Sequence, residues 1–276
     1  MIVLDPDGNE IQAIGREGGG PGEFRRPEAV AAADSAVFVL DFSNRRLLRF
    51  RPDGTFQGST LVELLPILPA DVNPRGDLVM PTLGIDSSLA RYLRAGEREP
   101  IRLGDPLAEP PRVITQSQIR AQALRGEIPV EFRNNVLPVL GPDGELWLVL
   151  QGEGVIQRYD ADGRQVGSIA LPDADREVAR EAFFEAWRAD EGSRDIHVPW
   201  MATAGTVVDG QLWLRLGPGE EGRSVIAVLD GATGRWVRRY ALETATPAGP
   251  FAVDPERGLL YVSLPDEAVL LRASLP

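Results

Sequence analysis

Few side chains in this 276-residue sequence could carry out chemistry, and the residue types that are absent limit the possible reactions. There is no cysteine and no lysine, so all 29 basic residues are arginines. This composition excludes thiol nucleophiles, thiolate metal sites, disulfides, Schiff-base lysines and the lysine of a Walker A phosphate loop. His197 is the only histidine, so a zinc site built from several histidines is also excluded.

The best polar cluster comprises Asp41, Asn44 and Arg45, which directly follow a short apolar stretch. Carboxylate and amide oxygens are ligands that a divalent cation such as calcium accepts, so Asp41 and Asn44 are candidate metal ligands. The alternative interpretation is structural. In that case Asp41 caps the turn and pairs with Arg45 or Arg46.

A second group of functional side chains, Arg194, Asp195, His197 and Trp200, lies within seven residues. His197 could act as a general base, but no Gly-x-Ser-x-Gly nucleophile motif accompanies it. A tryptophan beside polar residues suits a binding pocket, so we predict that these four residues bind a ligand. The alternative is an ordinary loop that packs a helix onto the rest of the molecule.

Two further patterns have the composition of ligand-binding loops without their full signatures. The glycine-rich segment 18–22 has no following helix and no lysine, so we predict a structural loop rather than a phosphate site. The segments 5–8 and 160–163 read Asp-x-Asp-Gly but lack the glutamate that completes a calcium loop. We predict that both are hairpin turns.

The net charge and the distribution of apolar residues limit the classes of partner that this protein can bind. The net charge is −12, which disfavours nucleic acid and anionic membrane surfaces. No apolar run approaches the roughly 18 residues that a membrane span needs. The N-terminus carries no secretory signal and begins directly in strand-like sequence, so a signal or an earlier segment could precede it. We expect a monomer.

The chain repeats one unit. Five short β-type runs each have a large central residue, and these central residues are Phe38, Val79, Trp147, Trp213 and Tyr261. The intervals between them are 41, 68, 66 and 48 residues, and the two long intervals contain helix-like inserts. Without the inserts, every interval matches the 40–50 residues of a β-propeller blade. Polar turns before and after each run predict four-stranded antiparallel meanders.

The blade count is open at this point. The N-terminal segment, with strands at 2–4 and 10–15, looks like the last two strands of a blade whose first two are missing. Five blades with a spare strand and six blades with an incomplete first blade both fit the sequence. An N-terminal strand can complete the last blade and close the ring.

We expect one propeller domain over 1–276 with inserts at about 107–130 and 173–199. Gln116–Ile128 and Asp173–Ser193 have helical periodicity. Both inserts join the last strand of one blade to the first strand of the next. Such connections share a rim of the ring with the loops 18–22 and 42–45, and a ligand is expected on that rim.

The motif Gly-x-Gly-Pro-Gly-Glu-Phe at 18–24, followed by Pro27, Val37–Asp41, Asn44 and Leu47–Phe50, resembles the NHL-repeat propellers of bacteria. The resemblance covers roughly residues 2–57, and later units keep the spacing but lose the signature. It implies six blades, a binding or scaffold role and, for many relatives, export. Some similar proteins are lyases with several histidines, which this chain lacks, or lactonases with Glu, Asn and Asp metal ligands.

These observations favour a non-enzymatic propeller that binds a peptide, glycan or protein partner on its helix-capped face, without a cofactor. The alternative is a metal-dependent hydrolase or lactonase that holds a divalent ion such as calcium in the central channel.

Overall fold

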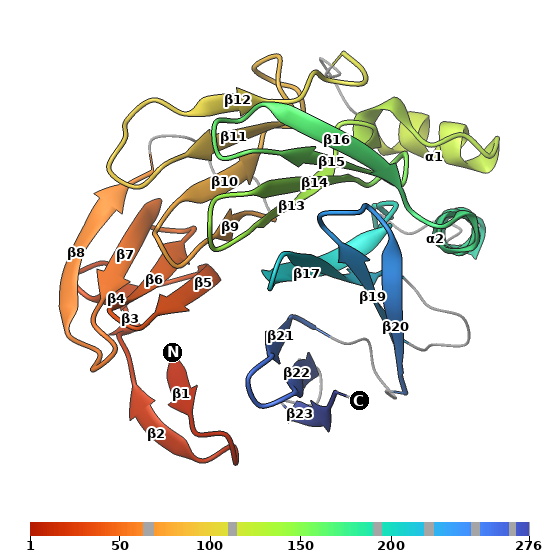
Figure 1. Ribbon diagram of the computed structural model, residues 1–276. Coiled ribbons are helices and arrows are strands. Elements are labelled where there is room, and N and C mark those ends of the chain that lie inside the picture. The colour runs from red at the N-terminus through yellow and green to blue at the C-terminus, as the bar shows by residue number, and fades with distance from the viewer. Residues whose placement is uncertain are drawn as a thin grey trace.

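The computed structural model describes residues 1–62, 69–109, 115–189, 195–217, 224–243, 249–264 and 269–275. Within these ranges, five antiparallel sheets are arranged around a central axis as the blades of a propeller (Figure 1). The expected all-β propeller with four-stranded blades and two helices is therefore confirmed.

In each blade the strands follow one another from the axis to the periphery. The first blade contains β5 (Pro27–Ala33), β6 (Ala36–Asp41), β7 (Arg46–Phe50) and β8 (Phe56–Leu61), and the second contains β9 (Asp71–Val72), β10 (Leu78–Pro81), β11 (Ala90–Leu93) and β12 (Ile101–Leu103). The third blade contains β13 (Val136–Leu140), β14 (Leu146–Leu150), β15 (Val155–Tyr159) and β16 (Gln165–Ala170), and the fourth contains β17 (Ala202–Val208), β18 (Gln211–Leu216), β19 (Ser224–Asp230) and β20 (Trp236–Leu242). The fifth blade contains β21 (Phe251–Asp254), β22 (Leu259–Leu264) and β23 (Val269–Ser274).

The second strand of the third blade, β14, is apolar on both faces because it is enclosed between the second and fourth blades. In β14, Leu146 and Leu148 belong to the cluster shared with the second blade. Trp147 and Val149 belong to the cluster shared with the fourth blade. All four side chains are buried. The core is thus a series of apolar layers between blades, as expected for strands buried on both sides.

The blade count follows the five-blade alternative. Among the described residues there are five blades and a separate hairpin, β1 (Ile2–Leu4) and β2 (Glu10–Ala13), between the fifth blade and the first (Figure 1). Met1, Val3 and Ile14 of this hairpin region pack on the first blade. On the other side, Arg272 donates to the carbonyl oxygen of Pro6 and lies 3.2 Å from the Asp7 carboxylate. The hairpin therefore contacts both ends of the row of blades.

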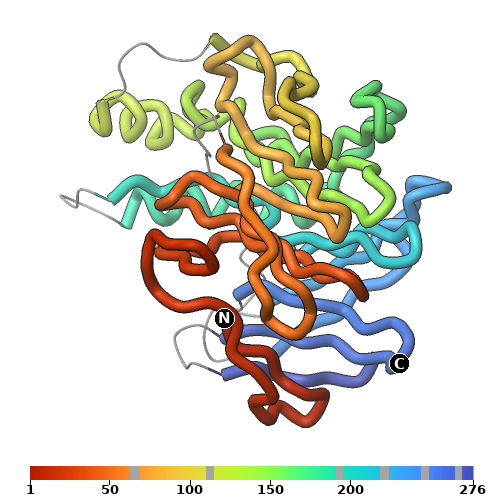
Figure 2. Tube along the Cα trace, turned by 90° about the vertical axis from the view of Figure 1, so that its left-hand side faces the viewer, coloured from red at the N-terminus to blue at the C-terminus, as the bar shows by residue number. Residues whose placement is uncertain are grey.

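Two helices interrupt the repeat. α1 (Gln116–Leu124) and the short helix η1 (Val130–Phe132) lie between the second and third blades, and α2 (Asp173–Ala189) lies between the third and fourth. The expected first helix reached Ile128, but α1 ends earlier, and Gly126 just beyond it has a positive φ of 77°. Figure 2 shows α1 on the same side of the ring as the loop that holds the short strands β3 (Arg16–Glu17) and β4 (Glu23–Phe24).

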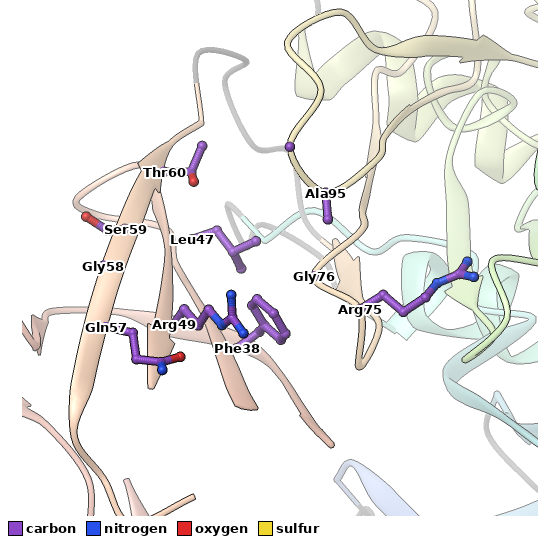
Figure 3. Close-up of a pocket in the computed structure, with 11 residues that line it drawn as sticks. Phe38, Leu47, Arg49, Gln57, Gly58, Ser59, Thr60, Arg75, Gly76 and Ala95 are labelled. Atoms are coloured by element: carbon purple, nitrogen blue, oxygen red, sulfur yellow. The ribbon is translucent and has the colours of Figure 1, made fainter. Parts of the chain in front are cut away.

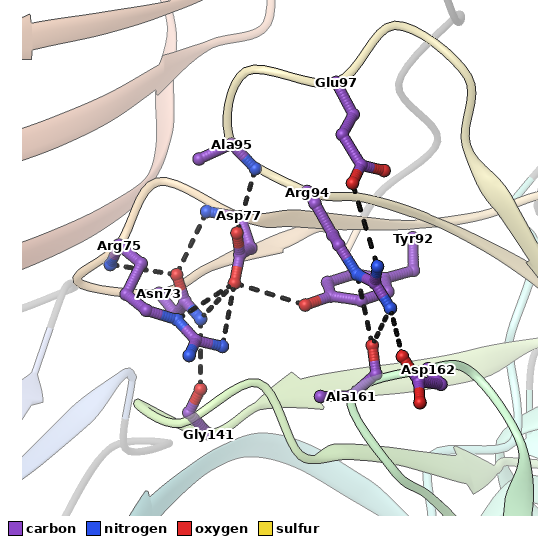
Figure 4. A network of polar contacts seen from close by, with 10 residues as sticks. All are labelled: Asn73, Arg75, Asp77, Tyr92, Arg94, Ala95, Glu97, Gly141, Ala161 and Asp162. Atoms are coloured by element: carbon purple, nitrogen blue, oxygen red, sulfur yellow. Dashed lines mark hydrogen bonds and ion pairs between the residues drawn. The ribbon is translucent and has the colours of Figure 1, made fainter.

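Buried polar side chains join successive blades. Asp77 accepts hydrogen bonds from the Asn73 amide, the Tyr92 hydroxyl and the backbone of Ala95, and Asn73 also donates to Gly141 of the third blade (Figure 4). Burial alone would raise the pKa of the Asp77 carboxyl, but these donors outweigh it and the pKa is lowered.

Candidate functional site

Helix α2 forms one wall of the site that the sequence indicated. Its first turn carries Asp173 and Asp175, whose negative charges favour a helix N-terminus. Ala179, Phe183 and Trp187 follow at intervals of four residues and are buried, so they form the face that packs inward.

The inward face of α2 rests on the other insert. Phe183 contacts Phe132 with their ring centroids 6.1 Å apart, and Trp187 is fully buried in the same cluster with Ile119 and Ala123 of α1. On the fourth blade, Arg239 of β20 donates to both carboxylate oxygens of Asp175, at 2.7 and 2.6 Å. The helix is therefore fixed both to α1 and to the propeller.

Between α2 and the segment that follows it lies a pocket with a volume of about 280 Å³. Ala179, Ala182, Phe183 and Ala186 line the pocket on the helix side. The opposite wall consists of Ile196, His197, Val198 and Trp200. Alanines at three positions on one helix face leave the space that larger side chains would fill. Nearly all of the lining is apolar, so the pocket suits an apolar group of a ligand.

The structure brings two of the four predicted ligand-binding residues into this pocket. His197 and Trp200 line it, and His197 lies edge-on to the ring of Trp187 at 5.2 Å between centroids. Asp195 does not line the pocket, and its carbonyl oxygen accepts a hydrogen bond from Gln116 of α1 at 3.0 Å. Arg194 lies outside the described residues. Whether these residues bind a ligand stays a prediction.

Two apolar groups remain accessible at the mouth of the pocket. Trp200 is 39% exposed and Ile196 is 52% exposed. Partly exposed tryptophan is typical of binding surfaces, because its large ring offers contact area at a low entropic cost. The alanine wall was missed at the sequence level. Its signal, Ala179, Ala182 and Ala186 on one helical face, is also what an ordinary amphipathic helix contains.

Asp41 and Asn44, the candidate metal ligands, organise the glycine-rich loop. The Asp41 carboxylate is fully buried and accepts hydrogen bonds from the backbone N–H groups of Arg25 and Arg26 and from the Asn44 amide. Asn44 also donates to the carbonyl oxygen of Gly18 at 3.0 Å. With these N–H donors around it, the Asp41 carboxylate fixes the glycine-rich loop to the end of β6. A metal at this position stays a prediction.

Within the described ranges, no group of three or more His, Asp or Glu side chains is placed to hold a metal ion. In the same part of the chain, no helix is both long enough and apolar enough to cross a membrane.

No family model matches the chain, and no curated protein matches it. Several solved structures are similar to it. A Bacteroides fragilis protein whose name describes it as exported has a TM-score of 0.54 and 12% identity over 95% of this chain and 72% of that chain. The β-propeller domain of Cps50 (Swd1) from Myceliophteria thermophila has a TM-score of 0.49 and 10% identity over 100% of this chain and 90% of that one.

Hydrazine synthase from Kuenenia stuttgartiensis has a TM-score of 0.47 and 14% identity over 87% of this chain. The present chain spans only 55% of the hydrazine synthase chain. At 12% identity, the similarity to the Bacteroides fragilis protein bears on the fold alone, and it agrees with the propeller architecture described above.

Proposed function

We propose that this protein is a non-enzymatic propeller that binds a peptide or protein partner on its helix-capped rim. The observation that carries the proposal is the pocket beneath α2, where three alanines face Ile196 and Trp200 across about 280 Å³ of space. This volume accommodates one large apolar side chain of a partner.

The lining narrows the ligand classes that the sequence left open. A glycan would need several hydroxyl, amide or charged groups to direct its hydroxyls, whereas the described lining residues offer only the His197 imidazole and the Trp200 indole N–H as polar groups. A peptide or protein that presents a leucine, methionine or aromatic anchor fits this chemistry better. The net charge of −12 further favours an anchor flanked by basic residues.

The test is a selection of peptides from a random display library on the wild-type protein, followed by titration of the selected peptides. Ala182→Leu fills the pocket, so selected peptides should lose at least about tenfold in affinity. The matched control is Ala174→Leu, which makes the same change on the same helix at an exposed position outside the pocket. Equal binding to both variants would contradict the proposal.

We infer that the chain is a divergent NHL-type propeller, and the contacts from Asp41 and Asn44 to the 18–26 segment support that assignment. Export is proposed on the family resemblance. The metal-dependent hydrolase has no observation in its favour among the described residues and stays a prediction. Elemental analysis of the purified protein tests it.

A further inference from the structure

Three arginines bridge successive units of the ring in the same way. Each lies in the third strand of its blade, or just beyond it, and donates to the turn between the third and fourth strands of the next unit. The donors are Arg94, Arg158 and Arg272, and the acceptors are the carbonyl oxygens of Ala161, Gly231 and Pro6. Figure 4 shows the first of these contacts, in which Arg94 also reaches Asp162 at 2.8 Å.

Arg49 has the equivalent position in the first blade but lacks the equivalent contact. It stands opposite Phe38 in the β6–β7 pair, as Arg158 stands opposite Trp147 in the third blade. The guanidinium carbons lie 5.7 and 5.1 Å from the centroids of these two rings. However, Arg49 has neither a hydrogen bond nor an ion pair to any residue that the structure describes.

A cavity occupies the place where the acceptor of Arg49 would be. The equivalent turn of the second blade joins β11 to β12 and contains Ala95 and Gly96. This turn lies across a cavity of about 560 Å³ from Arg49 (Figure 3). Gln57 and Thr60 of β8 also line the cavity. The other arginines of this set each donate to a carbonyl oxygen of the next unit, whereas Arg49 lines the cavity without such a contact.

Among the lining residues that the structure describes, Arg49 is a positive charge without an ionic partner and none is acidic. Arg75 also lines it, but its guanidinium pairs with Asp77 at 3.1 Å and points away from Arg49 in Figure 3. Phe38 and Leu47 contribute apolar surface, and the Gln57 amide and the Thr60 hydroxyl contribute hydrogen-bonding groups. Since strand connections alternate between the two rims, these turns lie on the rim opposite the helices.

We propose that this cavity between the first two blades binds a small organic carboxylate whose remaining skeleton carries hydroxyl groups, as in a sugar acid. Its carboxylate takes the place of the backbone carbonyl that the other arginines use, because a guanidinium presents paired donors that match a carboxylate. One free guanidinium matches one negative charge, which favours a monocarboxylate over a phosphate. The hydroxyls of the ligand pair with Gln57 and Thr60.

The test uses sodium glucuronate as the probe, with glucose and acetate as matched compounds that lack the carboxylate or the hydroxyls. Calorimetric titration of the full chain should give saturable glucuronate binding with a dissociation constant of about 1 mM. Glucose and acetate should each bind at least about tenfold more weakly. No saturable glucuronate binding, or equal binding of glucose, would overturn the proposal.

The residue assignment is tested with Arg49→Gln, which should weaken glucuronate binding at least about tenfold. The control Arg51→Gln removes the same charge two residues away, at an exposed turn outside the cavity, and should bind as the wild type does. Arg49→Lys retains the charge without the paired donors and should show an intermediate affinity. Binding by the Arg49→Gln variant equal to that of the wild type would overturn the assignment, and far-ultraviolet circular dichroism confirms that each variant is folded.

Discussion

At the scale of single residues, the fold strongly alters the ionisation of one described carboxyl, that of Asp71. Burial of Asp71, where β9 meets the third blade, raises the pKa of its carboxyl to about 6. Hydrogen bonds from the N–H groups of Leu140 and Val72 offset only part of that effect. The backbone of Leu140 donates to its carboxylate at 2.8 Å. The folded protein therefore holds a proton on Asp71 at a pH where the unfolded chain has released it.

This raised pKa predicts a stability difference that depends on pH. The stability that protonated Asp71 contributes to the folded protein is fully present below about pH 4 and is lost as the pH rises through about 6. Asp71→Asn stays neutral, so its free energy of unfolding relative to wild type should rise by about 1–3 kcal/mol between pH 4 and pH 7. Urea unfolding of both proteins across this range measures the difference, and a difference that does not change with pH would contradict the prediction.

Residue type also explains which site residues could be found from the sequence. His197 and Trp200 were found because histidine and tryptophan are rare and stood together. Arg49 was missed because an arginine in an alternating strand is ordinary. Its significance comes from comparison with Arg158 and Arg272, whose acceptors belong to other units of the ring and are far away in sequence.

At the scale of elements, side chains from the region between β6 and β7 hold the 15–24 loop. Arg46 donates to the carbonyl oxygens of Gly20 and Glu23. Asn44 joins Gly18 of this loop to Asp41 at the end of β6. Asn44→Ala removes both contacts, so amide exchange of residues 18–24 should accelerate and the free energy of unfolding should fall by about 1–2 kcal/mol. Hydrogen–deuterium exchange with mass spectrometry checks this. Unchanged protection of the loop would show that the Asn44 contacts to Gly18 and Asp41 do not hold it in place.

The individual strands were well predicted because each combines an apolar run with polar turns. The runs centred on Phe38, Trp213 and Tyr261 correspond to the observed strands β6, β18 and β22. The pocket beneath α2 could not be predicted in this way. Its two walls become neighbours only when α2 packs on α1 and Phe132, and periodicity within one helix does not specify that packing.

At the scale of the whole molecule, the described residues close the ring by contacts between the two end regions of the chain, and no sheet among them is shared by these regions. Arg272 of β23 reaches Pro6 and Asp7 in the turn of the N-terminal hairpin. The repeat predicted the blades, but it left five and six blades equally compatible, because the hairpin matches the outer half of a blade. Tertiary contacts were needed to place it.

The contact between Arg272 and the N-terminal hairpin predicts a local effect on that hairpin when the arginine is replaced. Arg272→Gln should accelerate amide exchange in residues 1–14 while it lowers the free energy of unfolding by no more than about 1 kcal/mol, since the side chain is 48% exposed. Arg257→Gln is the control, because Arg257 pairs with Asp254 within a single turn. Equal exchange of the hairpin in both variants would show that Arg272 does not hold the ends together.

The central claim, that partners bind in the pocket beneath α2, is tested most directly by locating a selected peptide on the protein. Methyl spectra of alanine-labelled protein should show the largest shifts at Ala179, Ala182 and Ala186 when the peptide is added, with small shifts at Ala29 and Ala31 of β5. The largest shifts at the β5 alanines, with none in α2, would place the partner on another part of the propeller and contradict the proposed function.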